Sequence, residues 1–327
     1  MSIFKEKERV ELFLLDQLAW ILVVLVYISF AVIKPTAMLN PATLHFLIYS
    51  SVPIGFLVLA ESMTLFTGNF DLSIAEQAGL IGMASGVILM RLPESSWLTP
   101  ILCVLLPIIF GILCGSLNGA LIGKAGLNPF LVTMGTMVAF DGLTMLIRPQ
   151  SIWARDLPKF FISIGANEVT SIIIFVLILL CVWFFLKYIR SGVYLYAVGS
   201  DRETSRMFGI NVENTIFMAY MLSGVFCGVS ALFYVGFNKG VPMNMAGGAL
   251  FPAFAGAVIG GVSLAGGRGS VVSAFAGSLL IGTLEAGLTM FAISPDARKV
   301  AFGILVVSAI VIDRFRTRLR DRILRPK

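Results

Sequence analysis

Acidic side chains inside apolar runs are the residues of this chain with the clearest capacity for chemistry. The sequence has 327 residues, of which 58% are hydrophobic and 13% charged. Glu61 and Glu285 lie deep within apolar runs, whereas Asp71 and Asp141 lie nearer to the ends of theirs. A charge at the centre of a bilayer costs at least about 2.5 kcal/mol, so such a carboxylate usually faces a cavity or a partner. Each could lie on a hydrophilic path for a solute or could clamp two helices together through a hydrogen bond. For Asp71, which precedes Leu72, a role at a helix N-terminus is favoured.

Asparagine and aromatic residues near the same positions extend this set. An asparagine in an apolar run can offer hydrogen bonds to a solute, and an aromatic ring can stack on a sugar or simply fill space. The candidates for a translocation path are therefore Glu61, Phe66, Asn69, Phe70, Asn118, Phe130 and Glu285.

The sequence contains no motif typical of an enzyme active site. The nearest approach to a phosphate-binding loop, GALIGKA at 119–125, has three residues between its glycines instead of four, and Ala125 where Ser or Thr would hold magnesium. His45 is the only histidine, which excludes a Ser/His/Asp triad and a zinc protease site. The four cysteines form no CxxC pair. We therefore expect no catalytic residues, no metal and no cofactor.

A charged interruption at 193–212, VYLYAVGSDRETSRMFGINV, is the other candidate functional stretch. Ser200 and Glu203 have the spacing of a capping box, in which the serine oxygen accepts the Glu203 amide. Gly209 tolerates the left-handed conformation that ends many helices. We expect one short helix within 200–209, either an ordinary capped surface helix or a plug for a groove on another protein. Its candidate contact residues are Ser200, Asp201, Arg202, Glu203, Arg206, Met207, Phe208 and Gly209.

The elements that must position these residues are membrane-spanning helices. Ordinary soluble domains carry about 25% charged residues, and a spanning helix needs about 20 apolar residues. Ten runs are candidate spans: 17–33, 44–66, 72–90, 97–122, 129–147, 171–188, 215–236, 250–264, 271–293 and 300–312. The sequence therefore predicts an all-α polytopic integral membrane protein of about ten helices, with residues 1–327 forming a single transmembrane domain.

The basic residues orient these spans. The net charge of +6 is concentrated at the two ends, in Lys5, Lys7 and Arg9 and in Arg314, Arg316, Arg318, Arg320, Arg322, Arg325 and Lys327. The positive-inside rule explains this distribution more simply than nucleic-acid binding does. With both termini cytoplasmic the number of spans is even, and 200–209 falls on the cytoplasmic side. The loop at 148–168 would lie outside and hold a short surface helix.

Small residues and two broken segments shape the predicted bundle. Glycines recur at four-residue spacing, as at Gly115 and Gly119 and at Gly224 and Gly228, which allows helix backbones to approach closely. The polar turns FTGNFDLS at 66–73 and GGVSLAGGRGS at 260–270 interrupt apolar runs and could be corresponding points of an internal duplication. Irregular backbone at membrane depth must be packed in protein or line a wet cavity.

Four strings, in order, carry a family resemblance. They are TGNFDLS at 67–73, GSLNGALIGKAGLNPFLVTMGTM at 115–137, YAVGSDRETSRMFGINV at 196–212 and AVIGGVSLAGGRGSVVSAFAGSLLIG at 257–282. Together they resemble the permease subunits of bacterial ATP-binding cassette (ABC) importers of the ribose, xylose and autoinducer-2 type, within the branched-chain amino acid permease superfamily. The matches cover most of 50–312.

This resemblance implies a set of partners and a location. In such an importer the 200–209 segment is the coupling helix, seated in a cleft of a separate ATPase subunit that hydrolyses ATP. Arg202, Glu203 and Arg206 would make polar contacts in that cleft, and Met207 and Phe208 would anchor the helix. A periplasmic or lipid-anchored solute-binding protein would deliver the solute, and a second permease copy or a similar permease would complete the path. The chain would reside in the inner or plasma membrane of the cell, in contact with membrane lipids.

The nature of the solute stays open at this point. A sugar or sugar-like solute competes with a nucleoside, a polyol or a branched-chain amino acid. An ion-coupled secondary carrier with Glu61 as a proton or sodium site, and a receptor that transports nothing, are the alternatives from other classes.

Overall fold

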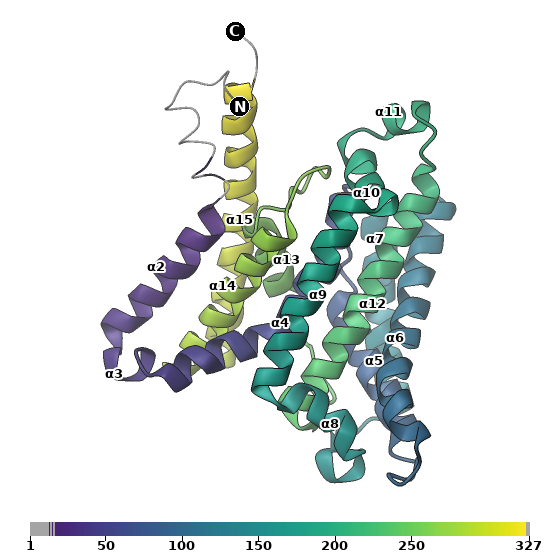
Figure 1. The fold of residues 1–327 in the computed structure, drawn as a ribbon, viewed down its shortest axis with the longest axis vertical. Helices are drawn as coiled ribbons and strands as arrows, with labels where there is room; N and C mark the ends of the chain where they lie inside the picture. The colour runs from purple at the N-terminus through teal and green to yellow at the C-terminus, as the bar shows by residue number, and fades with distance from the viewer. Residues whose placement is uncertain (1–12, 14, 16, 325–327) are drawn as a thin grey trace.

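Helices make up nearly all of this computed structural model, which describes residues 13, 15 and 17–324, with the backbone alone for 321 and 324 (Figure 1). Lys5, Lys7 and Arg9, on which part of the predicted orientation depends, lie outside the described residues, as do Arg325 and Lys327.

Six long apolar helices form the frame of the molecule. They are α4 (Pro41–Phe66), α6 (Leu98–Gly119), α7 (Pro129–Ile147), α9 (Glu168–Tyr188), α12 (Val212–Asn238) and α14 (Val271–Met290). A π-helical turn, Ala120–Lys124, extends α6. Within the described part of the chain, these six helices are long and apolar enough to cross a membrane. The predicted all-α, multi-pass architecture is confirmed.

The remaining predicted spans are shorter or different in extent. The helices α2 (Leu18–Ile33) and α5 (Ile74–Leu89) have 16 residues each, and α15 (Pro295–Leu324) runs well beyond the predicted 300–312. The predicted span 250–264 is wrong in length, because α13 (Leu250–Ile259) has only 10 residues, about 15 Å. The chain leaves the helix at Gly260 and turns at Gly261, whose φ is 96°. The number of complete crossings, ten, stays a prediction.

Short elements connect the frame. They are α3 (Pro35–Met38), α8 (Lys159–Ala166), α10 (Arg190–Ser200), α11 (Arg202–Met207) and the antiparallel strand pair β1 (Ile152–Trp153) and β2 (Gly240–Val241). The helix α8 confirms the short helix expected in the 148–168 loop. In Figure 1, α11 and the C-terminal end of α15 lie at one end of the molecule and α8 lies at the other.

The central helix of the bundle is α12, which packs against α4, α5, α6 and α8. Its contact with α6 depends on glycines from both helices. A Cβ atom on Gly115 would lie 2.3 Å from the Tyr220 carbonyl oxygen, and one on Gly224 would lie 2.0 Å from that of Gly111. The predicted close approach of small-residue stripes is therefore confirmed here. This packing holds the N-terminal end of α12, next to α11, in a fixed position.

Candidate functional site

Buried polar groups gather at the turn between α4 and α5. The Asp71 carboxylate accepts hydrogen bonds from the Ser73 amide (2.9 Å), the Ser73 hydroxyl (2.5 Å) and the Gln77 side-chain amide (3.0 Å). The Asn118 side-chain amide reaches across from α6 to donate to the Ser73 hydroxyl at 2.9 Å. All four side chains are fully buried. Asp71 therefore holds the segment that leads into α5, although Ser73 rather than Asp71 is the N-cap of that helix.

Glu61 supports the same turn from within α4. Both of its carboxylate oxygens lie 3.4 Å from the Asp71 amide nitrogen, and the side chain is fully buried. A buried carboxyl group needs hydrogen-bond partners of this kind. The contact fixes the polar turn against the helix that precedes it.

Two further contacts join this turn to α12 and to α11. The Tyr220 hydroxyl donates to the Phe70 carbonyl oxygen at 2.8 Å. The Arg202 guanidinium donates to the Asn69 side-chain oxygen at 3.1 Å. A charge-assisted hydrogen bond therefore connects the turn directly to α11.

The turn also meets two other segments through glycines. The Gly267 amide donates to the Phe66 carbonyl oxygen at 3.0 Å. A Cβ atom on Gly199 would lie 2.0 Å from that same oxygen, and one on Gly266 would lie 2.6 Å from the Gly68 nitrogen. We call Gly68, Gly199, Gly266 and Gly267 the glycine junction. At this junction the α4–α5 turn, the end of α10 and the α13–α14 loop touch backbone to backbone, so the two broken segments predicted from the sequence lie together.

The N-terminus of α11 differs from the prediction. Ser200 is the last residue of α10, and Asp201 is the N-cap, its side-chain oxygen accepting the Thr204 amide at 2.6 Å. The predicted capping box between Ser200 and Glu203 is therefore wrong. Ser200 has continued the preceding helix, and its hydroxyl lies 3.5 Å from the Gly267 carbonyl oxygen. The hydrogen bond from the Thr204 amide lowers the pKa of the Asp201 carboxyl.

The C-terminal end of α11 presents an apolar tip. Gly209 has a φ of 78° and ends the helix as expected. Met207 and Phe208 are 80% and 82% exposed. Arg206 is held by Glu203 (3.0 Å) and by Glu213 of α12 (2.7 Å), and the hydrogen bond that the Arg206 guanidinium donates to the Glu213 carboxylate raises the pKa of Arg206. The arginines thus fix the helix, while the two apolar side chains project from it.

The structure brings together most of the candidates for a translocation path. Glu61, Asn69 and Asn118 belong to the buried cluster described above, and the Phe66 ring packs on Tyr196 with centroids 4.7 Å apart. Phe70 and Phe130 form an edge-to-face pair at 6.4 Å, and Phe130 is 46% exposed.

Glu285 lies apart from the other candidates. It is an exposed residue of α14 and lines a pocket of about 280 Å³ with Asn238 and Arg298. Asn238 ends α12, at the far end of that helix from α11.

Sequence reasoning missed several members of the buried cluster. Tyr220 lies in a long apolar run within α12, and no sequence spacing connects it to its partner, the Phe70 carbonyl oxygen. Ser73 and Gln77 are four residues apart at the start of an apolar helix, so they share one face. That spacing was the available signal for a polar contact with Asp71.

Comparisons with known proteins identify relatives that match most of the chain. The chain is 30% identical over 306 residues to a fructose import permease protein of Rhizobium meliloti, covering 90% of this chain and 84% of the relative. It is 28% identical over 261 residues to a D-allose transport system permease protein of Escherichia coli K12, covering 78% of each chain. It is 25% identical over 267 residues to an autoinducer 2 import system permease protein of Photorhabdus luminescens, covering 79% of each.

No solved structure gives a significant match to the chain. The family profile of the branched-chain amino acid transport system permease component matches residues 43–310. That match includes the polar turn, residues 200–209 and the glycine junction, and the chain therefore belongs to this family of membrane permeases.

Proposed function

We propose that the chain is the transmembrane subunit of an ABC importer and forms the path for a sugar or a sugar-like small solute. The single observation that carries this proposal is the similarity, over most of the chain, to permeases named for the import of fructose, D-allose and autoinducer 2. A nucleoside, a polyol or a branched-chain amino acid is the alternative class of solute. ATP hydrolysis then belongs to a separate ATPase subunit.

The ATPase docks on α11 in this proposal. Exposed apolar side chains on a short helix are typical anchors for a groove on a partner, and Met207 and Phe208 provide them. Arg202 and Arg206 already have partners within the chain, at Asn69 and Glu213. We therefore assign docking mainly to the apolar tip and assign the arginines to passing its movement to the polar turn. Ser200, Asp201, Glu203 and Gly209 shape the helix that carries them.

A second permease copy, or a similar permease, covers the outer face of α7. Asp141 lies in the C-terminal half of that helix and is exposed, which is unfavourable against lipid. Gly135 and Gly142 lie on the same helix, and a Cβ atom on either would meet nothing within 4 Å. Glu76 of α5 interacts electrostatically with Asp141. A partner subunit would shield these carboxylates from lipid or enclose them in a wet path.

The solute path then runs along this face. Phe70 and Phe130 border it, while Glu61, Phe66, Asn69 and Asn118 hold the polar turn from behind. Glu285 is placed at the opposite mouth, where a solute-binding protein would deliver the solute. Both termini are cytoplasmic in this proposal, and the arginine-rich C-terminal end of α15 lies at the same end of the molecule as α11 (Figure 1).

Reconstituted transport tests the proposal. The chain is placed in proteoliposomes with its candidate ATPase and binding protein, and uptake of labelled fructose, D-allose, a nucleoside and a branched-chain amino acid is measured with and without ATP. We expect uptake of a sugar-like solute that requires all three components. Uptake that follows a proton or sodium gradient without the ATPase would instead identify a secondary carrier.

A further inference from the structure

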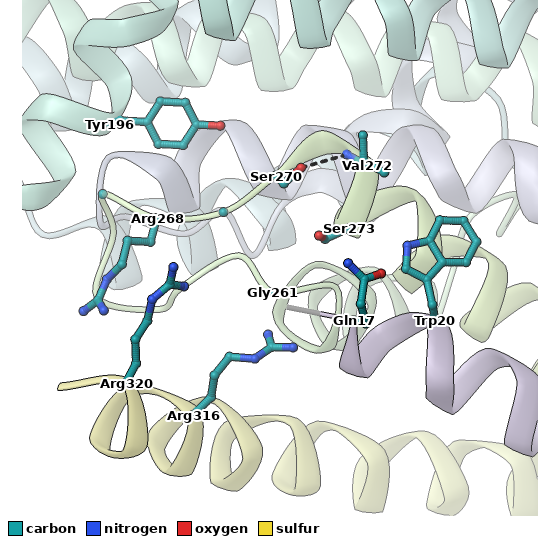
Figure 2. A pocket seen from close by; sticks show the side chains of 12 residues that line it. Gln17, Trp20, Tyr196, Gly261, Arg268, Ser270, Val272, Ser273, Arg316 and Arg320 are labelled. Atoms are coloured by element: carbon teal, nitrogen blue, oxygen red, sulfur yellow. Dashed lines mark hydrogen bonds between the residues drawn. The ribbon is translucent and has the colours of Figure 1, made fainter. Parts of the chain in front are cut away.

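A basic pocket of about 480 Å³ lies beside the glycine junction, between α2, α15 and the α13–α14 loop (Figure 2). Figure 2 shows Arg316 and Arg320 projecting from α15 and Arg268 reaching toward them from the loop. Trp20 of α2 and Ser273 near the start of α14 also line this pocket.

The charge of this pocket favours an anion. The Arg316 guanidinium donates to the Leu15 carbonyl oxygen at 2.8 Å and is largely buried, so its direction is fixed. Asp313 interacts electrostatically with Arg268 and Arg316. Guanidinium groups match the geometry of phosphate oxygens and bind them with two parallel hydrogen bonds. A phosphate group is therefore the chemistry that this pocket fits.

An apolar groove of about 390 Å³ continues from the basic pocket. Val272 lines both cavities, and the groove runs between α9 and α14 past Leu179, Trp183 and Phe275. The rings of Trp20, in the pocket, and Phe275, in the groove, lie 5.8 Å apart. A charged cavity joined to an apolar groove along two membrane helices has the two-part chemistry of a phospholipid rather than of a free anion.

The depth of the site agrees with a lipid. Val271 is the first residue of α14, so the arginines lie just beyond the end of a membrane-spanning helix. Lipid phosphates lie at that level, as do tryptophans of the interfacial belt. Basic pockets between transmembrane helices on the cytoplasmic side are known places for anionic headgroups.

We propose that the basic pocket and the apolar groove together bind one anionic phospholipid, with its phosphate between Arg268, Arg316 and Arg320 and an acyl chain along α9 and α14. The lipid would lie against Tyr196 of α10 and Gly267, close to the 200–209 segment. The proposal depends on the membrane location of the chain and is independent of the transported solute.

Lipid binding to the purified full-length protein tests this site. Native mass spectrometry measures binding of phosphatidylglycerol, of phosphatidylcholine with the same acyl chains, and of inorganic phosphate. We expect the native protein to prefer phosphatidylglycerol. The double variant Arg268→Gln/Arg320→Gln should bind it about 30-fold more weakly. The matched control is Arg314→Gln/Arg318→Gln, which removes the same charge from exposed positions of α15 and should bind normally.

A groove variant separates a lipid from a free anion. Val272→Trp should weaken phosphatidylglycerol binding and leave phosphate binding unchanged. Equal phosphatidylglycerol binding by the Arg268→Gln/Arg320→Gln and control variants would overturn the proposal. Phosphate binding that persists while Val272→Trp leaves phosphatidylglycerol binding unchanged would also overturn it, in favour of a free-anion site. Should the double variant not fold, equal binding of the two lipids by the native protein would overturn it as well.

Discussion

Gly199 illustrates how one residue can control the contact between three segments. It is the penultimate residue of α10, next to Ser200, and a Cβ atom there would lie 2.0 Å from the Phe66 carbonyl oxygen and 2.4 Å from the Gly267 nitrogen. Both neighbours are backbone atoms, which cannot move aside as a flexible side chain can. The close approach is what allows the Ser200 end of α10 to lie on the polar turn.

We expect Gly199→Ala to lower the free energy of unfolding by about 3 kcal/mol, because overpacking against fixed backbone is poorly relieved. Thermal unfolding in detergent measures this. The matched control is Gly303→Ala in α15, where a Cβ atom would meet nothing within 4 Å and helix propensity favours alanine. Equal unfolding temperatures for the two variants would contradict the geometry of the junction.

The hydrogen bond between Arg202 and Asn69 is a second residue-scale target. In a double-mutant cycle with Arg202→Ala and Asn69→Ala, we expect the coupling energy to be about 1 kcal/mol, since the donor is charged and the site is partly buried. The same variants should reduce transport per ATP hydrolysed in the reconstituted complex. Arg314→Ala, at an exposed position of α15, is the control. Additive effects of the two substitutions would show that the contact transmits nothing.

Residue-level prediction from the sequence succeeded where the chemistry was local. Gly209 was expected to end the helix, and its φ of 78° agrees. The N-cap of α11 could not be chosen from the sequence, because Ser200 with Glu203 and Asp201 with Thr204 have the same spacing. The choice depends on where α10 ends, and that is set by the packing of Gly199 on distant backbone.

At the scale of elements, α11 depends on its cap. The pKa of Asp201 is lowered by the hydrogen bond from the Thr204 amide. The ionised cap therefore stabilises α11 above the ordinary carboxyl pKa, and this contribution is lost as the pH falls through the lower value of the folded state. We expect amide exchange at Thr204, corrected for its intrinsic pH dependence, to accelerate in that acid range.

Substitutions at the two competing cap positions check this assignment. Asp201→Asn should retain the cap while losing its pH dependence, since asparagine is an equally good N-cap. Ser200→Ala should leave exchange at Thr204 unchanged. Faster exchange in Ser200→Ala than in Asp201→Ala would restore the serine as the cap.

The apolar tip of α11 gives a second prediction at this scale. Met207→Ser/Phe208→Ser should weaken binding of the ATPase at least about tenfold, because each side chain would lose more than 1 kcal/mol of burial. Co-purification and titration of the ATPase measure this. Trp153→Ser, at a 65% exposed aromatic residue in the loop that contains α8, is the control. Unchanged ATPase binding by the double variant would place the docking surface elsewhere.

Element boundaries show what an apolar run can and cannot specify. The run 129–147 coincides with α7, because Asn128 caps it and Pro129 starts it. The run 250–264 is interrupted at Gly260, where Gly256, Ser273 and Ala274 leave no space for a side chain. That interruption is dictated by the neighbouring α14, which a hydropathy pattern cannot reveal.

At the scale of the whole molecule, the exposed face of α7 is the feature that most favours a second permease subunit. In a variant without native cysteines, we expect Gly142→Cys to form disulfide-linked permease pairs in native membranes, since this open face would lie against the second subunit. Gly303→Cys in α15 tests whether crosslinking is specific to α7. Monomeric Gly142→Cys under oxidising conditions, or equal crosslinking of both variants, would remove α7 from the interface.

The global architecture was largely predictable, because long apolar runs and terminal arginines constrain a membrane protein strongly. The all-α, multi-pass fold followed from them, and four ordered strings indicated the family. The meeting of the α4–α5 turn with the α13–α14 loop could not be derived, since the two lie nearly 200 residues apart and their contact is made through backbone atoms. The partnership of Arg202 with Asn69 has the same long-range origin.

The glycine junction also determines where this chain can be recombined with a relative. A chimaera that exchanges 201–211 replaces α11, its cap and the Arg202 partner of Asn69, but it leaves Gly199 packed on Phe66, so the glycine junction stays native while the apolar tip changes. A crossover placed upstream of Gly199 would bring a foreign backbone into this close contact, where a Cβ atom would lie 2.0 Å from the Phe66 carbonyl oxygen. A chimaera meant to bind a different ATPase subunit should therefore have its crossover after Ser200.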